Sequence, residues 1–232
     1  MIMQKTAIVF GATGLTGTYL VKELTQNEQY QNIKVFNRRT QNYDNTKIEE
    51  YLINFNQLNE YAHEFKADDV FCCLGTTLKK AGSKEKFFEI DHDLPIQIAR
   101  ICQNNHCETF IAISAIGANP NSKNYYLRTK GMMEQEILNL DFRFQAFVRP
   151  SMLLGSRTES RPAETFAKLI MKIFGFLFVG KLKKYRGIHA QTVAKAMIHI
   201  INQQNYFSTL EKIFFESNEL LNISETINHD KQ

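Results

Sequence analysis

The stretch AIVFGATGLTGTYLVKEL, residues Ala7–Leu24, places three glycines between an apolar run and an amphipathic run. The apolar run predicts a buried strand, and the residues from Leu15 onward predict a helix. In this setting Gly11 permits a sharp turn after the strand, Gly14 lets backbone amides approach a pyrophosphate, and Gly17 lets the helix pack close to the sheet. The stretch therefore predicts a dinucleotide-binding loop, with a ligand-free strand–helix turn as the alternative. A Walker phosphate loop is excluded because its Gly-Lys-Ser/Thr ending is missing.

Strand-like and helix-like runs alternate through the first two thirds of the chain. The expected strands are 6–10, 33–38, 48–55, 69–75, 109–117 and 144–155, and the expected helices are 15–26, 57–67, 83–105 and 125–140. The strands are apolar on both faces, as in a parallel sheet that helices cover. The alternation predicts an α/β protein with a doubly wound parallel sheet and helices on both faces. We expect a single domain over residues 1–232, in which residues 156–232 form a small helical C-terminal cap with a last strand near 212–217.

The composition is that of an ordinary globular protein. Hydrophobic residues make up 44% and charged residues 22%, and 28 basic against 24 acidic residues give a net charge of +4. This balance does not favour nucleic acid, and the dense basic run Lys181–Arg186 is typical of a solvated turn. No apolar run reaches membrane-spanning length without charges. The nearest, Phe166–Gly180, predicts an amphipathic helix over about 164–179 that buries against the domain or a second subunit, with membrane docking ranked lower.

The four cysteines, Cys72, Cys73, Cys102 and Cys107, form no CxxC pair and have no histidine at zinc-ligand spacing. We therefore expect buried, reduced thiols, which favour a cytoplasmic location. The N-terminus runs directly into a strand and lacks the long apolar stretch and the cleavage site of a signal peptide.

The end of the second expected strand indicates which cofactor the protein prefers. An acidic residue there would bind the adenosine ribose hydroxyls, whereas this chain has Asn37, Arg38 and Arg39. Two guanidinium groups suit a 2′-phosphate, so the sequence predicts NADP in preference to NAD. Asp44 is a rival acidic residue, but it lies beyond the turn.

Ser114, Tyr126 and Lys130 are the candidate catalytic residues. Tyr126 and Lys130 share one face of a predicted helix because four residues separate them. The ammonium of the lysine, together with the nicotinamide charge, is expected to lower the pKa of the phenol and fit it for proton transfer. Ser114 lies at the end of the preceding strand, where its hydroxyl can position a reacting oxygen. Tyr30 and Tyr43 also have a lysine four residues on, but neither has a serine partner.

Four further motifs sharpen this interpretation: Phe71–Asp93 (FCCLGTTLKKAGSKEKFFEIDHD), Tyr126–Gly131 (YLRTKG), VRPSMLLG at 148–155 and Glu159–Glu164 (ESRPAE). Together with the glycine loop they resemble the Tat-interacting-protein oxidoreductase family, an atypical group of short-chain dehydrogenases/reductases. The resemblance extends to about Phe176 and implies a Rossmann-type NADPH-binding fold.

The resemblance also implies a set of cofactor-binding positions. They are Gly11, Thr13, Gly14, Leu15, Thr16, Gly17, Arg38, Arg39, Asn54, Phe55, Leu74, Gly75, Thr76, Tyr126, Lys130, Pro150 and Ser151. Two residues depart from the family pattern. Asn54 replaces an aspartate that faces the adenine in many relatives, and Asp91 replaces an asparagine that serves a proton relay in extended-branch enzymes.

No metal site is expected. Asp91, His92 and Asp93 are consecutive, so on a helix they point around the axis and do not converge on one ion. Six phenylalanines are candidates for a substrate pocket or, equally, for the core: Phe87, Phe88, Phe166, Phe174, Phe176 and Phe178.

Two functions from different classes follow. The first is an NADP-dependent oxidoreductase that acts on a small carbonyl or alcohol, and the sequence leaves open whether it forms a homodimer. The second is a catalytically quiet NADPH-binding sensor, which would have no need of the Ser-Tyr-Lys set. A nucleotide-sugar epimerase uses the same residues but normally has a larger C-terminal substrate domain than this chain offers.

Overall fold

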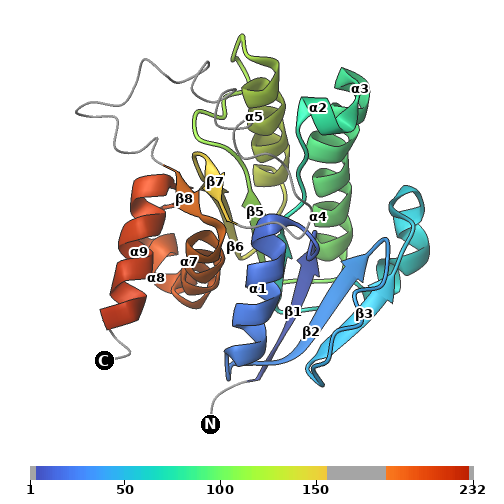
Figure 1. The fold of residues 1–232 in the computed structure, drawn as a ribbon, viewed down its shortest axis with the longest axis vertical. Coiled ribbons are helices and arrows are strands. Elements are labelled where there is room, and N and C mark those ends of the chain that lie inside the picture. Colours follow the sequence, from blue (N-terminus) through green and yellow to red (C-terminus); the bar gives the residue numbers. More distant parts are fainter. Residues whose placement is uncertain (1–3, 156–186, 230–232) are drawn as a thin grey trace.

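A seven-stranded parallel sheet forms the centre of the computed structural model, which describes residues 4–155 and 187–229. The strand order is β3-β2-β1-β4-β5-β6-β9, and every pairing in the sheet is parallel. The strands are β1 (Lys5–Phe10), β2 (Tyr30–Asn37), β3 (Ile48–Leu52), β4 (Asp69–Cys72), β5 (Thr109–Ile113), β6 (Phe144–Arg149) and β9 (Phe214–Glu216). The sheet reverses its winding direction between β1 and β4, which confirms the doubly wound α/β fold (Figure 1).

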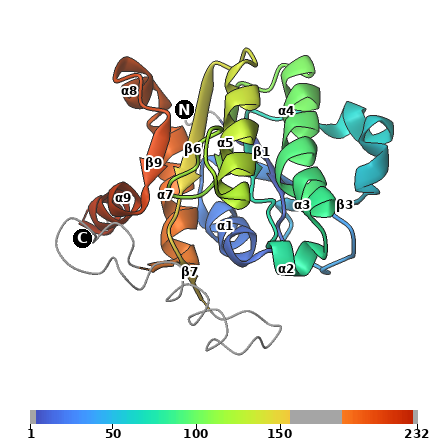
Figure 2. The same ribbon diagram turned by 90° about the horizontal axis from the view of Figure 1, so that it is seen from above.

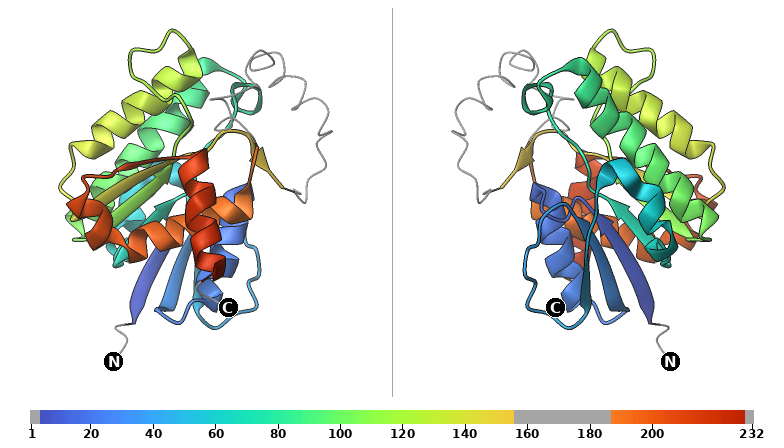
Figure 3. Two further views of the ribbon diagram at one scale, coloured as in Figure 1. Left: turned by 90° about the vertical axis from the view of Figure 1, so that its left-hand side faces the viewer. Right: turned by 90° about the vertical axis from the view of Figure 1, so that its right-hand side faces the viewer.

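Helices cover both faces of this sheet (Figure 2). One layer contains α1 (Leu15–Gln26), α7 (Ala190–Asn202), α8 (Gln204–Thr209) and α9 (Ser217–His229). The other contains the 3₁₀ helix η1 (Phe55–Glu64), α4 (Leu94–Asn104) and α5 (Tyr125–Leu138). Two views at right angles to Figure 1 show α4 and α5 side by side along the sheet (Figure 3).

Side-chain alternation along β1 explains the two layers. Ala7 and Val9 join the hydrophobic cluster beneath α1 and α7, whereas Ile8 and Phe10 join the cluster beneath η1, α4 and α5. All four side chains are fully buried. A strand buried on both faces must be apolar at every position, which is why the sequence around the glycine loop begins with a continuous apolar run.

The single helix expected over 83–105 is divided into three parts. These are α3 (Lys84–Phe88), the π-helical turn η2 (Glu89–Asp93) and α4, preceded by the short helix α2 (Leu78–Ala81). Pro95 lies in the first turn of α4 and has no N–H to bond the carbonyl of Asp91, four residues earlier, so the regular α-helical ladder is interrupted there. The strand expected over 48–55 is also shorter, because Asn54 caps η1 through its side chain.

The described part of the C-terminal region adds to the main body of the fold. Helix α7 packs on α1 and on α9, and β9 pairs with β6 at the edge of the sheet. A second, two-stranded sheet joins β7 (Leu153–Leu154) to β8 (Ile188–His189). Helix α9 was not anticipated, although Leu220 anchors it in the core. The expected amphipathic helix over 164–179 lies outside the described residues.

Candidate active site

The glycine loop after β1 and the loop after β4 meet at the carboxyl edge of the sheet. Gly11 has φ +78°, and a Cβ atom there would lie 2.7 Å from the carbonyl carbon of Cys73. A Cβ atom at Gly17 would lie 2.1 Å from the carbonyl oxygen of Gly11. The first and third glycines are therefore required by backbone contacts, one to the neighbouring loop and one within the turn itself.

The N-terminus of α1 is open to a ligand. Gly14 is its N-cap residue and no side chain caps the helix. Thr13 and Gly14 are exposed and Leu15 is half-buried, whereas the hydroxyl of Thr16 is buried and has no hydrogen-bond partner among residues 4–155 and 187–229. A glycine-lined helix N-terminus with uncapped amides and a positive dipole fits the pyrophosphate of a dinucleotide.

Arg38 and Arg39 follow β2 on the surface, and no ion pair to either guanidinium forms within the described parts of the chain. The neighbouring acidic group, Glu50 of β3, is already engaged. Its carboxylate accepts hydrogen bonds from the Asn37 amide at 2.7 Å and from the Thr40 hydroxyl at 2.8 Å. Glu50 thus holds the loop that carries both arginines, a role that no spacing pattern in the sequence indicates.

Asn54 and Phe55 lie at the end of β3. The Asn54 side chain accepts a hydrogen bond from the backbone N–H of Asn56 and so caps η1. Phe55 lines a cavity of about 220 Å³ between η1, η2 and α4. None of the glycine-loop residues lines this cavity.

Helix α5 carries the candidate catalytic pair, and Asn124 caps its N-terminus through a hydrogen bond from the Leu127 N–H. The Lys130 ammonium is almost fully buried and lies 2.8 Å from Oδ1 of Asp91 on η2. It also lies 3.4 Å from the carbonyl oxygen of Ile113, the last residue of β5. This second contact brings the lysine to the strand end where Ser114 follows.

The Ser114 hydroxyl is buried and has no hydrogen-bond partner within the described residues. Its backbone N–H donates to the carbonyl of Val148 on the neighbouring strand, which fixes its position at the sheet edge. A buried hydroxyl without a partner is costly unless another molecule supplies one. It is therefore free to donate to, or accept from, a substrate oxygen.

Tyr126 is half-buried and its ring packs against that of Phe87, with 5.6 Å between the ring centroids. Burial raises the pKa of the Tyr126 phenol; Lys130 acts in the opposite direction, and Asp91 reinforces the rise. The lowering effect of the lysine on the Tyr126 pKa is thus present, but the net direction is upward. Burial lowers the pKa of Lys130 and Asp91 raises it, with a net rise.

The residues expected to line the cofactor beyond β4 and β6 lie at the same edge. Thr76 donates its N–H to Oδ2 of Asp91 at 2.8 Å, and a Cβ atom at Gly75 would lie 3.4 Å from Oδ1 of that carboxylate. Leu74 is half-buried. After β6, the Pro150 carbonyl accepts from the Ile116 N–H, and the Ser151 N–H donates to the Ser217 hydroxyl at 2.6 Å.

Asp91 is the residue whose importance the sequence analysis missed. It was noted as a departure from a family asparagine, yet the structure makes it the direct ion-pair partner of Lys130. No local pattern links two residues thirty-nine positions apart. The contact arises only because the fold packs η2 against α5.

The other candidate residues that the structure describes pack in the core or contact neighbouring side chains. Phe87 is fully buried, and Phe88 stacks on His92 with ring centroids 4.1 Å apart. The remaining four phenylalanines lie outside the described residues. His92 contacts Asp93 at 2.8 Å, and no cluster of three or more metal-ligating side chains occurs in residues 4–155 and 187–229.

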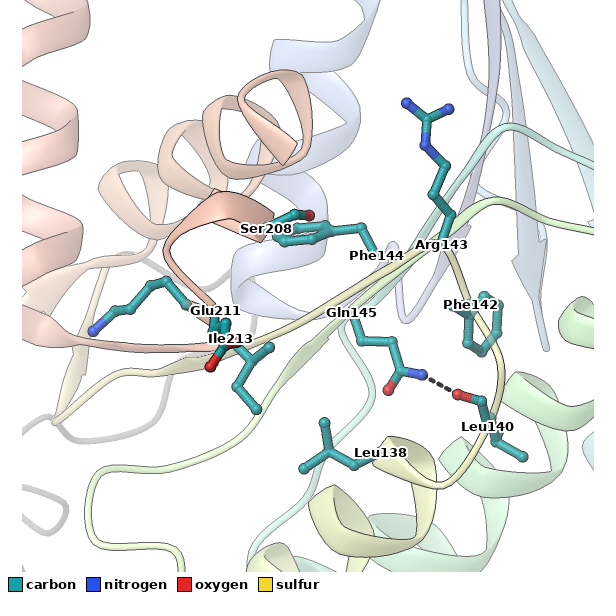
Figure 4. A pocket seen from close by; sticks show the side chains of 10 residues that line it. Leu138, Leu140, Phe142, Arg143, Phe144, Gln145, Ser208, Glu211 and Ile213 are labelled. Carbon is teal, nitrogen blue, oxygen red and sulfur yellow. Dashed lines mark hydrogen bonds between the residues drawn. The ribbon is translucent and has the colours of Figure 1, made fainter. Parts of the chain in front are cut away.

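A larger pocket, of about 310 Å³, lies at the opposite edge of the sheet (Figure 4). Gln145 and Ile213 line it, together with residues of the α5–β6 connection. The Gln145 amide donates to the carbonyl of Leu140. Because these residues precede or begin β6 and β9, the pocket is separated from the glycine loop and from Lys130 by the length of the strands. The candidate active site is therefore the carboxyl edge and not this pocket.

The fold and this edge define a nucleotide-binding protein of the short-chain dehydrogenase type. The profile of the NAD dependent epimerase/dehydratase family matches residues 7–209, and the chain belongs to that family.

Individual relatives agree with this membership. The chain is 33% identical to Protein HTATIP2 of Rattus norvegicus over 202 residues, which cover 85% of this chain and 81% of the relative. It is 32% identical to the mitochondrial protein FMP52 of Candida glabrata over 194 residues, covering 81% and 80% of the two chains. The FMP52 protein of Saccharomyces cerevisiae is 27% identical over 227 residues, covering 95% and 96%. The resemblance to the Tat-interacting-protein family is thereby confirmed.

Solved structures share the fold. MoeE5 in complex with UDP-glucose and NAD matches with a TM-score of 0.66 and 16% identity, covering 96% of this chain and 81% of that one. The Pen protein of Bacillus thuringiensis matches with a TM-score of 0.67 and 15% identity, covering 87% and 69%. At these identities the likeness concerns the fold alone.

The relatives correct the cytoplasmic location expected from the sequence. Several fungal relatives are named as mitochondrial proteins, so the inference from the cysteines was wrong. Reduced thiols exclude an oxidising compartment, but they do not distinguish the cytosol from the mitochondrial interior. In the described parts of the chain, no helix has the length and apolar character needed to cross a bilayer.

Proposed function

We propose that this protein is an NADP(H)-dependent oxidoreductase that interconverts a small carbonyl compound and the corresponding alcohol. The observation that carries the proposal is the buried hydroxyl of Ser114, which has no partner in the described part of the chain and lies at a strand end that Lys130 also reaches from α5. Tyr126 lies one helical turn before Lys130, and the glycine loop lies at the same sheet edge. This combination supports a reaction centre next to a bound nicotinamide nucleotide.

Each residue has a distinct role in the proposed reaction. The bound cofactor supplies or accepts the hydride. The Ser114 hydroxyl holds the substrate oxygen, and the Tyr126 phenol donates a proton to that oxygen during reduction or removes one during oxidation. Lys130 orients the nicotinamide ribose and offsets negative charge on the phenol oxygen. The glycine loop and the N-terminus of α1 hold the pyrophosphate.

The preference for NADP is part of this proposal. The exposed guanidinium groups of Arg38 and Arg39 have no ion pair in the described structure, and Glu50 is occupied by the loop itself. Free guanidinium groups favour the 2′-phosphate of the cofactor. The alternative, an NADPH-binding sensor without turnover, would use the same nucleotide contacts but not the Ser114 hydroxyl.

The test is a panel of small aldehydes, ketones and quinones with NADPH, followed through the absorbance of the reduced nicotinamide. We expect turnover of at least one class, and we expect Tyr126→Phe to abolish it while NADPH affinity stays within a few fold. Full activity in Tyr126→Phe would overturn the mechanism. If NADPH binds tightly and no compound turns over, the sensor function replaces the enzyme. Light scattering checks whether the protein forms the homodimer that the sequence leaves open.

A further inference from the structure

The Lys130 ammonium has a buried counter-ion of its own. Oδ1 of Asp91 lies 2.8 Å from Nζ, and the exposed fraction of the two side chains is 0% for Asp91 and 3% for Lys130. A buried ion pair persists only where its geometry is good and its remaining polar atoms are satisfied. Here Oδ2 of Asp91 accepts the Thr76 N–H at 2.8 Å. The carboxylate therefore links the β4 loop to the lysine of α5.

The local backbone conformation at Asp91 places this carboxylate next to Lys130. Asp91 lies in the π-helical turn η2, between α3 and α4. Such turns widen a helix locally and are often found at functional sites. Gly75 lies against the ion pair, since a Cβ atom there would be 3.4 Å from Asp91 Oδ1 and 3.7 Å from Lys130 Nζ.

We propose that Asp91 is a positioning residue that fixes Lys130 and balances its charge, so that the Tyr126 phenol stays protonated until it delivers its proton to the substrate oxygen. This inference rests on the proposed function and names the residue that keeps its acid protonated. Without Asp91, an unbalanced buried cation beside the phenol would favour the phenolate, which is the form that accepts a proton during alcohol oxidation.

The charge balance follows from the groups that face Lys130. They are Asp91 from η2, Tyr126 on α5 and the Cys72 thiol at the end of β4. Burial raises the pKa of Cys72 to about 11, so this thiol is neutral near pH 7. Asp91 is then the one anion in the described surroundings of Lys130. The negative charge of Asp91 cancels the positive charge of Lys130. The Tyr126 phenol can therefore stay protonated and neutral in a buried site that has no net charge.

The deciding experiment measures the ionisation of Tyr126 in the cofactor-free protein. For each protein, the ultraviolet absorbance of tyrosinate is recorded as the pH is raised. The curve of the same protein carrying Tyr126→Phe in addition is then subtracted, so that the difference reports Tyr126. Asp91→Asn keeps the size and an acceptor for the Thr76 N–H but removes the charge. Asp93→Asn is the matched control, because Asp93 is two residues on and contacts His92 rather than Lys130.

We expect the Tyr126 titration to move to lower pH in Asp91→Asn and to remain at the wild-type position in Asp93→Asn and Asp91→Glu. With a substrate in hand, the pH at which the rate of alcohol oxidation rises should move down by the same number of pH units in Asp91→Asn. An unchanged titration in folded Asp91→Asn overturns the inference. If Asp91→Asn does not fold, the titration of the wild-type protein tests the inference. Ionisation of Tyr126 with a midpoint below the usual phenol pKa of about 10 contradicts the inference. The titration needs no turnover, so failure of the proposed enzyme activity is a separate outcome.

Discussion

Gly17 of α1 lies in backbone contact with Gly11, since a Cβ atom at Gly17 would be 2.1 Å from the Gly11 carbonyl oxygen. Gly17→Ala must push the helix away from the turn, so we expect a loss of about 2–3 kcal/mol in the free energy of unfolding. Gly75→Ala is the control, because its Cβ atom would meet only ordinary contacts. Its stability should stay within about 1 kcal/mol of wild type. Urea denaturation measures both, and equal stability of the two variants contradicts the prediction.

The next prediction concerns the choice between NADPH and NADH. Because Arg38 and Arg39 are free of ion pairs in the described structure, we expect NADPH to bind at least tenfold more tightly than NADH, or about 1.4 kcal/mol. Arg38→Asp should remove most of this difference, since it replaces a phosphate-binding cation by an anion. Calorimetric titration with both nucleotides measures the two affinities.

Arg143→Asp is the matched control for that experiment. Arg143 is exposed and pairs with Glu108 at the opposite edge of the sheet, 2.8 Å away. Its replacement should leave both affinities unchanged. Equal affinity of the wild type for the two nucleotides would exclude the preference for NADP.

Much of the fold was predictable because the central strands β1, β4 and β5 are buried on both faces and strands alternate with helices along the chain. The glycine loop was the strongest local signal. Gly17 is required by its contact with Gly11, six residues earlier, and Gly11 by its contact with Cys73 after the adjacent strand β4. The last strand, expected near 212–217, was predictable for the same reason and is found as β9. These features depend on short-range patterns, which a sequence displays directly.

The features that were missed depend on contacts between distant segments. The break in the helix expected over 83–105 arises where a π-helical turn brings Asp91 to Lys130, and only the packing of two helices brings them together. The same holds for Glu50, which reaches the loop after β2 from the neighbouring strand. The pKa of Tyr126 was expected to fall because the lysine was considered without its burial or its counter-ion.

A third prediction concerns stability at the amino edge of the sheet. The Tyr30 hydroxyl is fully buried and donates to Oδ2 of Asp69 at 2.7 Å. Tyr30→Phe removes a hydrogen bond to a carboxylate and should cost about 2 kcal/mol in the free energy of unfolding. Tyr206→Phe is the control, because this side chain is 60% exposed. Urea denaturation near pH 7 should show a loss for the first variant and almost none for the second.

The Tyr30 contribution also has a defined pH dependence. Burial, and after it the charge of Asp69, raises the pKa of Tyr30 well above its usual value. A phenol whose pKa is raised by folding stabilises the folded state fully below its unfolded pKa of about 10, and this contribution is lost as the pH rises through the folded pKa. The difference between wild type and Tyr30→Phe should therefore be constant between pH 6 and about pH 9 and shrink above about pH 10. A difference that grows with alkalinity contradicts this assignment.

The last prediction concerns the stability cost of removing the buried cation. Lys130→Met leaves the fully buried Asp91 carboxylate without its counter-ion, so we expect the free energy of unfolding to fall by about 3 kcal/mol at pH 7. Adding Asp91→Asn removes the uncompensated charge, and the double variant should be more stable than Lys130→Met alone. Lys212→Met is the control, because Lys212 pairs with Glu219 in a more exposed position and should cost less than about 1 kcal/mol. Denaturant titrations of the wild type, Lys130→Met, Asp91→Asn and the double variant form a double-mutant cycle. The cycle gives the coupling energy between Asp91 and Lys130. A coupling energy near zero would mean that the two charges are independently solvated, against the buried ion pair described here.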